Sequence, residues 1–246
     1  MKMRFTVLGF WHGFPEAGEA SSGYLLEKDD FRLLIDCGSG VVSQLQKYCP
    51  IEEVDALILS HYHHDHFSDI GVLQYARLVH NAWKAEDRKL MAYGHLLDKE
   101  KYNLLSYEPH VTAMPYNPDK VLNVGPFTIS FLRTKHPAPC CAMKITDGNT
   151  TIVYTADTSY FQELHQFALD CDLLIAECTF YEHQDPTAAG HMNSRDVGIL
   201  AQKANAKKLL LTHLPHFGDR NQLVKQVESY YQGPTELAKS GWSYER

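Results

Sequence analysis

The feature that most constrains this chain is a cluster of histidines just after a predicted strand. Positions 60–67 read Ser-His-Tyr-His-His-Asp-His-Phe, which places four imidazoles and one carboxylate within six residues. Such a group would make a poor hydrophobic core, because every buried polar nitrogen needs a hydrogen-bond partner. A histidine-rich surface turn is the alternative, and the spacing of the histidines argues against it. The segment forms a loop between an apolar strand and an amphipathic helix, and loops held by a rigid scaffold commonly carry function.

The spacing within the cluster predicts which side chains bind metal. His61 and His63 are two positions apart, so in extended chain they project to the same side and can approach one ion together. Asp65 and His66 lie at the turn into the helix, where their side chains can reach a second ion nearby. His64 projects to the other side and is expected to be exposed or to lie outside the ligand set. Imidazole and carboxylate donors suit zinc, and manganese or iron accepts the same ligand types.

Strand-like and helical patterns alternate along the 246 residues without a linker or repeat, so one α/β (α+β) domain over residues 1–246 is predicted. Antiparallel meanders are expected in both halves, with helices outside them. This order predicts two sheets packed face to face in a four-layer αββα sandwich. Strands are expected at 5–9, 24–27, 31–36, 55–60, 127–134, 142–146, 151–155, 173–176 and 209–212, helices at 40–48, 194–205 and 219–232, and a turn at 147–149.

Composition excludes several classes of protein. The chain has 23 basic and 30 acidic residues, and this balance argues against non-specific coating of nucleic acid, which needs positive charge. No apolar run is long enough to span a membrane, and the N-terminal residues do not resemble a signal peptide, so a cytoplasmic location without a membrane partner is expected. The six cysteines form no Cys-x-x-Cys pair and are expected to be reduced thiols in the core.

The cluster at 61–66 resembles the His-x-His-x-Asp-His signature of the metallo-β-lactamase superfamily, whose members complete the site from three further strand ends. His136, Asp157 and His213 follow predicted strands in the required order. Each alone would be interpreted as a cap or turn residue, but together with the cluster they are expected to be ligands. The resemblance implies the family's αββα fold and two divalent metal ions, one held by His61, His63 and His136 and the other by Asp65, His66 and His213, with Asp157 bridging them.

An aspartate early in the chain matches a further position of the family. Asp36 ends the predicted strand at 31–36. In the family this carboxylate orients the ligand imidazoles through hydrogen bonds, a role that is physically reasonable beside so many histidines. Capping of the helix at 40–48 is the alternative, and the sequence leaves both open.

Several further segments are similar to ribonuclease Z and its relatives rather than to the antibiotic-cleaving enzymes. In that group a histidine before a helix stabilises the scissile phosphate or protonates the leaving oxygen. The resemblance gives this role to His191, with Glu177 supporting it and raising its affinity for a proton. A surface histidine and a solvated strand-end acid are the alternatives. The similar segments are the glycines and proline at 9–15, Ser-Gly-Tyr at 22–24, Asp-Cys-Gly-Ser-Gly at 36–40, Tyr-Thr-Ala-Asp-Thr at 154–158, Glu-Cys-Thr-Phe at 177–180 and His-Met-Asn at 191–193.

The sequence departs from ribonuclease Z in one important respect. Bacterial members insert a long arm that grips tRNA between the third and fourth metal motifs, whereas His136 and Asp157 are only 21 positions apart. The basic residues nearby, Lys203, Lys207 and Lys208, are typical of a solvated helix end. Processing of tRNA 3′ ends therefore loses support, and a short or single-stranded RNA or a cyclic nucleotide is the favoured substrate.

The resemblance implies a hydrolase that cleaves phosphodiesters with a hydroxide formed between two metal ions. Asp65 would orient the water and accept its proton, and His191 would protonate the departing alkoxide. A hydrolase of a thioester, lactam or lactone is one alternative, and a non-catalytic metal-bound domain that binds a nucleotide is another. Members of the group are commonly homodimers, and the sequence neither supports nor refutes this.

Overall fold

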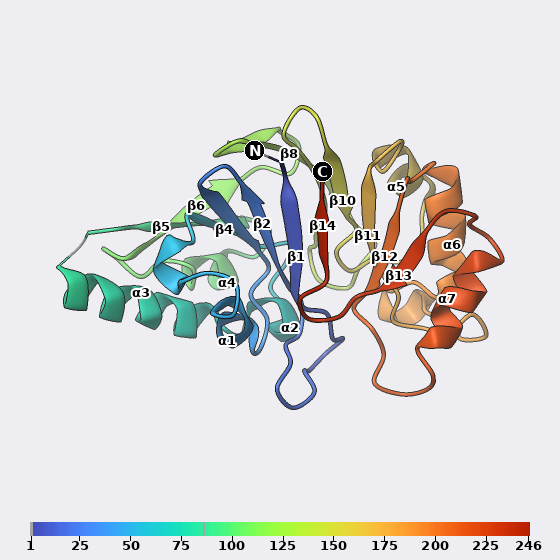
Figure 1. The fold of residues 1–246 in the computed structure, drawn as a ribbon, viewed down its shortest axis with the longest axis horizontal. Helices are drawn as coiled ribbons and strands as arrows, with labels where there is room; N and C mark the ends of the chain where they lie inside the picture. Colours follow the sequence, from blue (N-terminus) through green and yellow to red (C-terminus); the bar gives the residue numbers. More distant parts are fainter. Residues whose placement is uncertain (1, 86) are drawn as a thin grey trace. The chain divides into compact units, whose positions relative to one another are not determined.

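Each of the two predicted sheets is present, and each belongs to a separate unit of the chain. The computed structural model describes residues 2–85 and 87–246. The first unit comprises residues up to 117 together with 239–246, and the second comprises 118–238 (Figure 1). Within the described residues, none of the helices has the length and hydropathy that a membrane span requires.

The first unit contains a seven-stranded mixed sheet with the order β14-β1-β2-β3-β4-β5-β6. Strands β14, β1, β2 and β3 pair antiparallel, and β3 to β6 pair parallel. The strands are β1 (Arg4–Gly9), β2 (Gly23–Lys28), β3 (Phe31–Ile35), β4 (Ala56–Ile58), β5 (Leu90–His95), β6 (Val111–Tyr116) and β14 (Ser243–Glu245). The helices are α1 (Val41–Leu45), the 3₁₀ turn η1 (Ile51–Glu53), α2 (His64–Phe67), α3 (Ile70–Lys84) and α4 (Lys99–Asn103).

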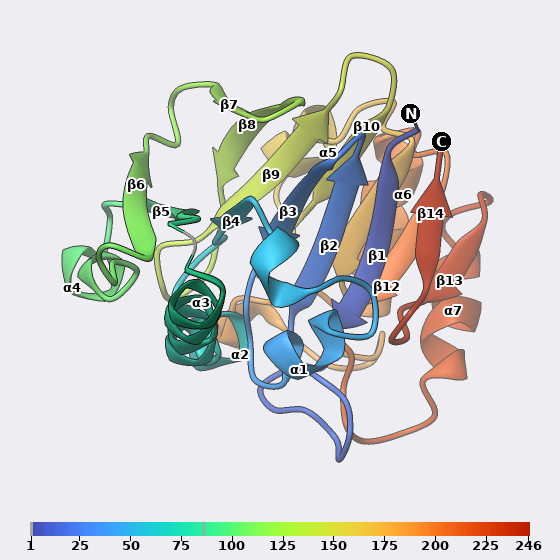
Figure 2. The ribbon, with the colours of Figure 1, turned by 60° about the vertical axis from the view of Figure 1, so that its left-hand side comes forward.

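Helices α1 and α3 cover one face of this sheet (Figure 2). Apolar side chains of both helices pack in one cluster with Leu25, Leu34 and Leu57, which lie side by side on neighbouring strands. Helix α3 is further anchored by Arg77, whose buried guanidinium donates hydrogen bonds to the carbonyls of Glu52 and Val54 at 2.8 and 2.7 Å. These contacts fix the strands whose ends carry the histidine cluster.

The second unit also contains a seven-stranded mixed sheet, with the order β13-β12-β11-β10-β9-β8-β7. Strands β7 to β10 pair antiparallel, and β10 to β13 pair parallel. The strands are β7 (Leu122–Val124), β8 (Phe127–Arg133), β9 (Cys141–Thr146), β10 (Thr151–Tyr154), β11 (Leu173–Glu177), β12 (Leu209–Thr212) and β13 (Thr235–Leu237). The helices are α5 (Gln162–Phe167), the 3₁₀ turn η2 (Thr187–Ala189), α6 (Ser194–Lys203) and α7 (Asn221–Glu228).

The predicted turn at 147–149 closes the hairpin between β9 and β10. The carboxylate of Asp147 accepts hydrogen bonds from the backbone amides of Asn149 and Thr150 at 2.9 and 2.8 Å. Gly148 has φ +90°, a conformation that favours glycine. This turn lies at the amino end of β10, away from its carboxyl end.

The expected antiparallel meander is present in each unit, but the other half of each sheet is parallel, which was not predicted. Strands β5, β6, β7, β13 and β14 were not predicted, and three of them, β5, β6 and β13, belong to the parallel halves. Parallel neighbours need a crossover connection, which α1, α3 and α4 supply in the first unit and α5, α6 and α7 supply in the second (Figure 1). The parallel arrangement matters for the site, because the carboxyl ends of parallel strands meet at one edge of a sheet.

The six cysteines all lie within the described residues, are buried and form no disulfide, as predicted. Burial raises the pKa of the Cys140 and Cys178 thiols well above the usual range. These sulfurs therefore stay protonated and do not compete as thiolate ligands.

Candidate metal centre

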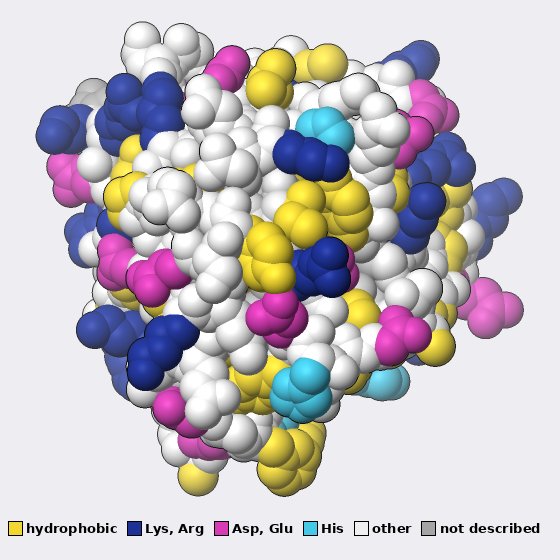
Figure 3. Space-filling view, turned by 90° about the vertical axis from the view of Figure 1, so that its right-hand side faces the viewer, with side chains coloured by type: hydrophobic (Ala, Val, Ile, Leu, Met, Phe, Trp, Pro, Cys, Tyr) yellow, Lys and Arg dark blue, Asp and Glu magenta, His cyan; other side chains and the backbone are white. Residues whose placement is uncertain are grey.

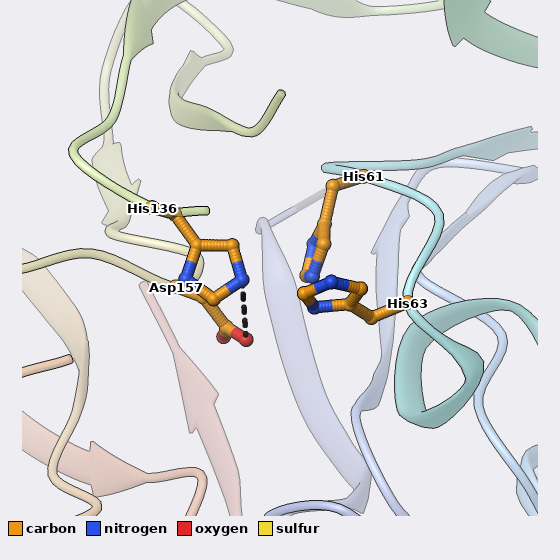
Figure 4. Close-up of side chains that lie close together, drawn as sticks. All are labelled: His61, His63, His136 and Asp157. Atoms are coloured by element: carbon orange, nitrogen blue, oxygen red, sulfur yellow. Dashed lines mark ion pairs between the residues drawn. The ribbon is translucent and has the colours of Figure 1, made fainter. Parts of the chain in front are cut away.

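The histidine cluster of the first unit is gathered between the end of β4 and helix α2. His61, Asp65 and His66 are buried, whereas His63 is exposed. The ring centroid of His61 lies 4.8 Å from that of His63 and 4.2 Å from that of His66. Figure 4 shows His61 and His63 turned toward each other. The first unit thus brings its three predicted ligand imidazoles together, while His64 is exposed as expected.

Asp36 orients two of these imidazoles. Its Oδ2 accepts hydrogen bonds from His66 Nδ1 and from the Ser60 hydroxyl, both at 2.8 Å, and its Oδ1 accepts from the Ser60 backbone amide at 2.7 Å. Ser60 Oγ also lies 3.0 Å from His61 Nδ1. Because the hydroxyl has one proton and gives it to the carboxylate, Ser60 accepts the Nδ1–H of His61. In both imidazoles Nε2 is therefore the nitrogen that carries the lone pair for coordination.

The alternative role of Asp36, capping the following helix, is taken by another residue. The backbone amide of Val42 in α1 donates to Asp69 Oδ2 at 3.0 Å. Asp36 itself is fully buried and has φ +56°, a strained conformation at the end of β3 that turns its carboxylate toward Ser60 and His66. Support of the ligands is thus the role that the hydrogen bonds favour.

Asp65 is held by backbone groups of two loops. Its Oδ2 accepts a hydrogen bond from the Gly13 amide at 2.8 Å and lies 3.8 Å from His66 Nε2. A Cβ atom at Gly38 would lie 1.9 Å from the Asp65 carbonyl oxygen, so only glycine allows this approach of the 36–40 turn. The carboxylate is therefore fixed in place, with Oδ2 engaged by the amide.

The second unit brings its own three predicted ligands together. Asp157 Oδ2 lies 3.9 Å from His136 Nε2 and 3.5 Å from His213 Nε2, so the carboxylate is close to both imidazoles. Figure 4 shows its contact with His136. These residues follow β8, β10 and β12 as predicted. The Nδ1–H of His136 donates to the Gly190 carbonyl at 3.0 Å. Burial lowers the pKa of His136, with Asp157 opposing the shift, so the neutral, ligating form is favoured.

Glu177 orients imidazoles of the second unit by hydrogen bonds, as Asp36 does in the first. It is fully buried at the end of β11, and its Oε1 accepts from His191 Nδ1 at 2.9 Å. Its Oε2 accepts from the Thr179 hydroxyl at 2.9 Å, and the same hydroxyl oxygen lies 2.9 Å from His213 Nδ1. Thr179 therefore accepts the Nδ1–H of His213, by the argument given for Ser60.

Each unit thus uses one buried carboxylate to set two imidazoles, one directly and one through a hydroxyl. Ser60 and Thr179 were not identified from the sequence as functional residues. The sequence gives only a weak signal for them: Ser60 precedes a predicted ligand, and Thr179 lies two residues after a predicted functional acid.

The donor set fits divalent metal ions. The ligand atoms it offers are imidazole nitrogens and carboxylate oxygens, which suit zinc, manganese or iron. In His61, His66, His136 and His213 the Nδ1–H has an acceptor, which leaves Nε2 for coordination. Such outer hydrogen bonds are a regular feature of metal-ligating histidines.

Removing either hydroxyl is expected to weaken metal binding. Ser60→Ala and Thr179→Val each take away the acceptor that sets one imidazole, and we expect metal affinity to fall by about 10–100-fold. Thr179→Ser keeps the hydroxyl and serves as the matched control. Competition titrations with a metal chelator measure the change, and an unaltered affinity in both hydroxyl-free variants would contradict this role.

Comparison with known proteins tests whether the chain belongs to the metallo-β-lactamase superfamily. A family model described as "Beta-lactamase superfamily domain" matches residues 31–214, and the chain belongs to this superfamily. The predicted metallo-β-lactamase fold is confirmed, and the chain is a metallo-hydrolase by fold and family.

Individual relatives include one of high similarity. The "Probable metallo-hydrolase YhfI" of Bacillus subtilis is 51% identical over 243 residues, covering 99% of this chain and all of the relative. A crystal structure of the B. subtilis metallo-beta-lactamase fold protein YhfI matches with a TM-score of 0.99 at 50% identity, and both chains are covered completely. A ribonuclease Z of Myxococcus xanthus is 25% identical over 304 residues, covering 99% of this chain and 97% of the relative. The resemblance to ribonuclease Z is therefore confirmed as a distant relationship.

Proposed function

We propose that this chain is a phosphodiesterase that depends on divalent metal ions and acts on short or cyclic nucleotide substrates. The observation that carries the proposal is the Glu177–His191 pair. His191 is 6% exposed, its Nδ1 is held by a buried carboxylate, and its ring centroid lies 5.3 Å from that of His213. An imidazole held in this way beside a predicted ligand suits protonation of an alkoxide leaving group. Hydrolysis of a thioester, lactam or lactone does not require it.

The ligands of the two units are proposed to act together on two ions. One ion would be held by His61, His63 and His136, the other by Asp65, His66 and His213, and Asp157 would bridge them. When bound, such ions lower the pKa of a coordinated water and neutralise charge on the phosphate oxygens. The same roles can be filled by zinc, manganese or iron.

The side chains of this chain would perform the proton transfers. Asp65, fixed through Oδ2 by the Gly13 amide, orients the attacking water and accepts its proton. His191, fixed through Nδ1 by Glu177, donates a proton from Nε2 to the departing oxygen. Glu177 holds His191 in this orientation. Its Oε1 also accepts a hydrogen bond from the Thr158 backbone amide, which fixes the position of the carboxylate.

A small substrate is favoured over a folded RNA. Between His136 and Asp157 the described chain forms only the β9–β10 hairpin, with no arm. On the face that carries α6 and α7, lysines and arginines are interspersed with acidic side chains and do not form one basic surface (Figure 3). Binding of a long nucleic acid would need such a surface to release counterions.

An activity screen tests the proposal. Metal-loaded protein, with its metal content measured, is assayed on 2′,3′-cyclic nucleotides, cyclic dinucleotides, short RNA and pre-tRNA, beside a thioester and a β-lactam. We expect cleavage of cyclic nucleotides or short phosphodiesters without cleavage of pre-tRNA. Turnover of the thioester or lactam alone would overturn the proposal. Tight binding of a nucleotide without any turnover would instead favour the non-catalytic alternative.

We also propose that the chain forms a homodimer through helix α3. Four large apolar side chains on its outer face, Val72, Tyr75, Val79 and Trp83, are 54%, 63%, 48% and 88% exposed. From 71 to 83 every exposed residue of the helix is apolar or glycine, which is unusual for a surface in contact with water. The face suits a second copy, because an antiparallel two-fold pairing about position 77 sets Tyr75 against Val79 of the partner subunit and the large Trp83 against Gly71 of the partner subunit.

Charge placed on this face is expected to abolish the dimer. Tyr75→Glu combined with Trp83→Lys should give a monomer in light scattering at micromolar concentration, because a desolvated charge at the centre of an interface is costly. Phe217→Lys changes an aromatic side chain that is 83% exposed in the second unit and is the control. A wild-type monomer, or a variant that remains dimeric, would contradict the proposal.

A further inference from the structure

Three loops of the second unit line an open pocket of about 440 Å³ beside His136. The loops are 135–137, 159–160 and 187–190. Each loop contains, or lies within two residues of, a residue of the proposed catalytic site. His136 belongs to the first, Asp157 lies two residues before the second, and His191 follows the third. A group bound in this pocket would therefore lie next to the reacting bond.

Hydrogen bonds tie these loops to one another. The Lys135 amide donates to Thr158 Oγ1 at 3.1 Å, and the Ser159 amide donates to the Lys135 carbonyl at 2.9 Å. His136 Nδ1 donates to the Gly190 carbonyl, which belongs to the third loop. The walls of the pocket are thus held at fixed positions relative to the ligand side chains of this unit.

The lining of the pocket suits an anion. The lining residues include Lys135, Ser159, Tyr160 and Thr187, and none of the described lining residues carries a carboxylate. The Thr187 side chain is also hydrogen-bonded to the neighbouring Asp185 carboxylate. Lys135 Nζ lies 5.4 Å from the centroid of the Phe161 ring, which helps to position it. Lys203 Nζ lies 3.4 Å from the Tyr160 hydroxyl, so a second positive charge stands beside this lining residue. Ammonium and hydroxyl donors together recognise phosphate oxygens.

We propose that this pocket binds a second phosphate of the substrate, beyond the phosphodiester that is cleaved. The inference rests on the proposed phosphodiesterase function and narrows its substrate class. Linear oligonucleotides and cyclic dinucleotides carry such a phosphate, whereas a 2′,3′-cyclic mononucleotide does not. Lys135 is the residue that distinguishes them.

Kinetics on three dithymidine phosphodiesters test the proposal, one with a 5′-terminal phosphate, one with a 3′-terminal phosphate and one with neither. We expect wild-type kcat/KM to be about tenfold or more higher for one of the phosphorylated compounds, as a charge-assisted hydrogen bond would give. Lys135→Ala should abolish most of this preference, Lys135→Arg should keep it, and Lys120→Ala, which changes an exposed lysine elsewhere, should leave it unchanged. The metal content of each variant shows whether His136 has been disturbed.

A binding measurement separates the two possible failures. If metal-loaded wild-type protein cleaves neither these three compounds nor any cyclic nucleotide or RNA of the activity screen, the proposed function is wrong. Calorimetric titration with thymidine 3′,5′-bisphosphate then decides about the pocket. Binding that weakens about tenfold in Lys135→Ala at unchanged metal content supports the pocket. Equal binding to wild type and Lys135→Ala, or cleavage without any preference for a terminal phosphate, overturns it.

Discussion

Replacing His191 by alanine is expected to lower kcat for dinucleotide hydrolysis by about 10²–10⁴-fold while leaving the metal content near that of the wild type. The Nδ1–H of His191 donates to Glu177 Oε1 at 2.9 Å, so Nε2 is the nitrogen that supplies a proton to the leaving oxygen. A nucleoside alkoxide needs this proton, whereas p-nitrophenolate leaves readily without it. The loss should therefore be much smaller for bis-p-nitrophenyl phosphate than for a dinucleotide.

Two further variants separate proton donation from a structural role of His191. Glu177→Gln keeps an acceptor for His191 Nδ1 but removes the charge, and we expect an intermediate loss of kcat. His183→Ala removes an exposed histidine from the same segment of the chain and should leave kcat unchanged. Wild-type rates on dinucleotides by a metal-loaded His191→Ala protein would remove this residue from the mechanism.

Loss of the Asp65 carboxylate is expected to have the second large effect, with Asp65→Ala abolishing turnover. Asp65→Asn is the sharper variant, because its amide oxygen can still accept the Gly13 N–H that now bonds to Oδ2 at 2.8 Å, but an amide takes up no proton. We expect kcat to fall by about a thousandfold or more, assayed at saturating metal with the metal content measured.

His64→Ala is the matched control for Asp65, because His64 is the preceding residue of the same helix and is exposed. This variant should retain the activity and the thermal stability of the wild type. If Asp65→Asn with a full complement of metal kept more than a tenth of the wild-type rate, proton acceptance by Asp65 would be wrong.

The ligand residues could be predicted because their signal is local. His61, His63, Asp65 and His66 fall within one loop, and the chemistry of four imidazoles in six residues leaves few other interpretations. His136, Asp157 and His213 were recognised through the family resemblance, which expects ligands at three further strand ends, and the structure confirms that they follow strands. The roles of these residues as ligands, and the extent of one domain over residues 1–246, stay predictions.

The arrangement of the strands could not be predicted in the same way. Strand β6 contains Pro115, and β13 and β14 are three-residue strands with polar side chains, so their sequences carry little strand signal. Without β6 and β13 the parallel halves of the sheets are not evident from the sequence. Ser60 and Thr179 were missed for a different reason, because hydroxyl residues are common at strand ends and only the distances to Asp36, His61, Glu177 and His213 reveal what they do.

The turn between β9 and β10 offers a practical route into this protein. Gly148 is exposed, and no atom of another segment lies within 4 Å of the position that a Cβ would take. Asp157, in contrast, follows the opposite end of β10. A fluorophore or affinity handle grafted at this tip would sit a strand's length from the reactive groups, in the kind of exposed turn where insertions are best tolerated.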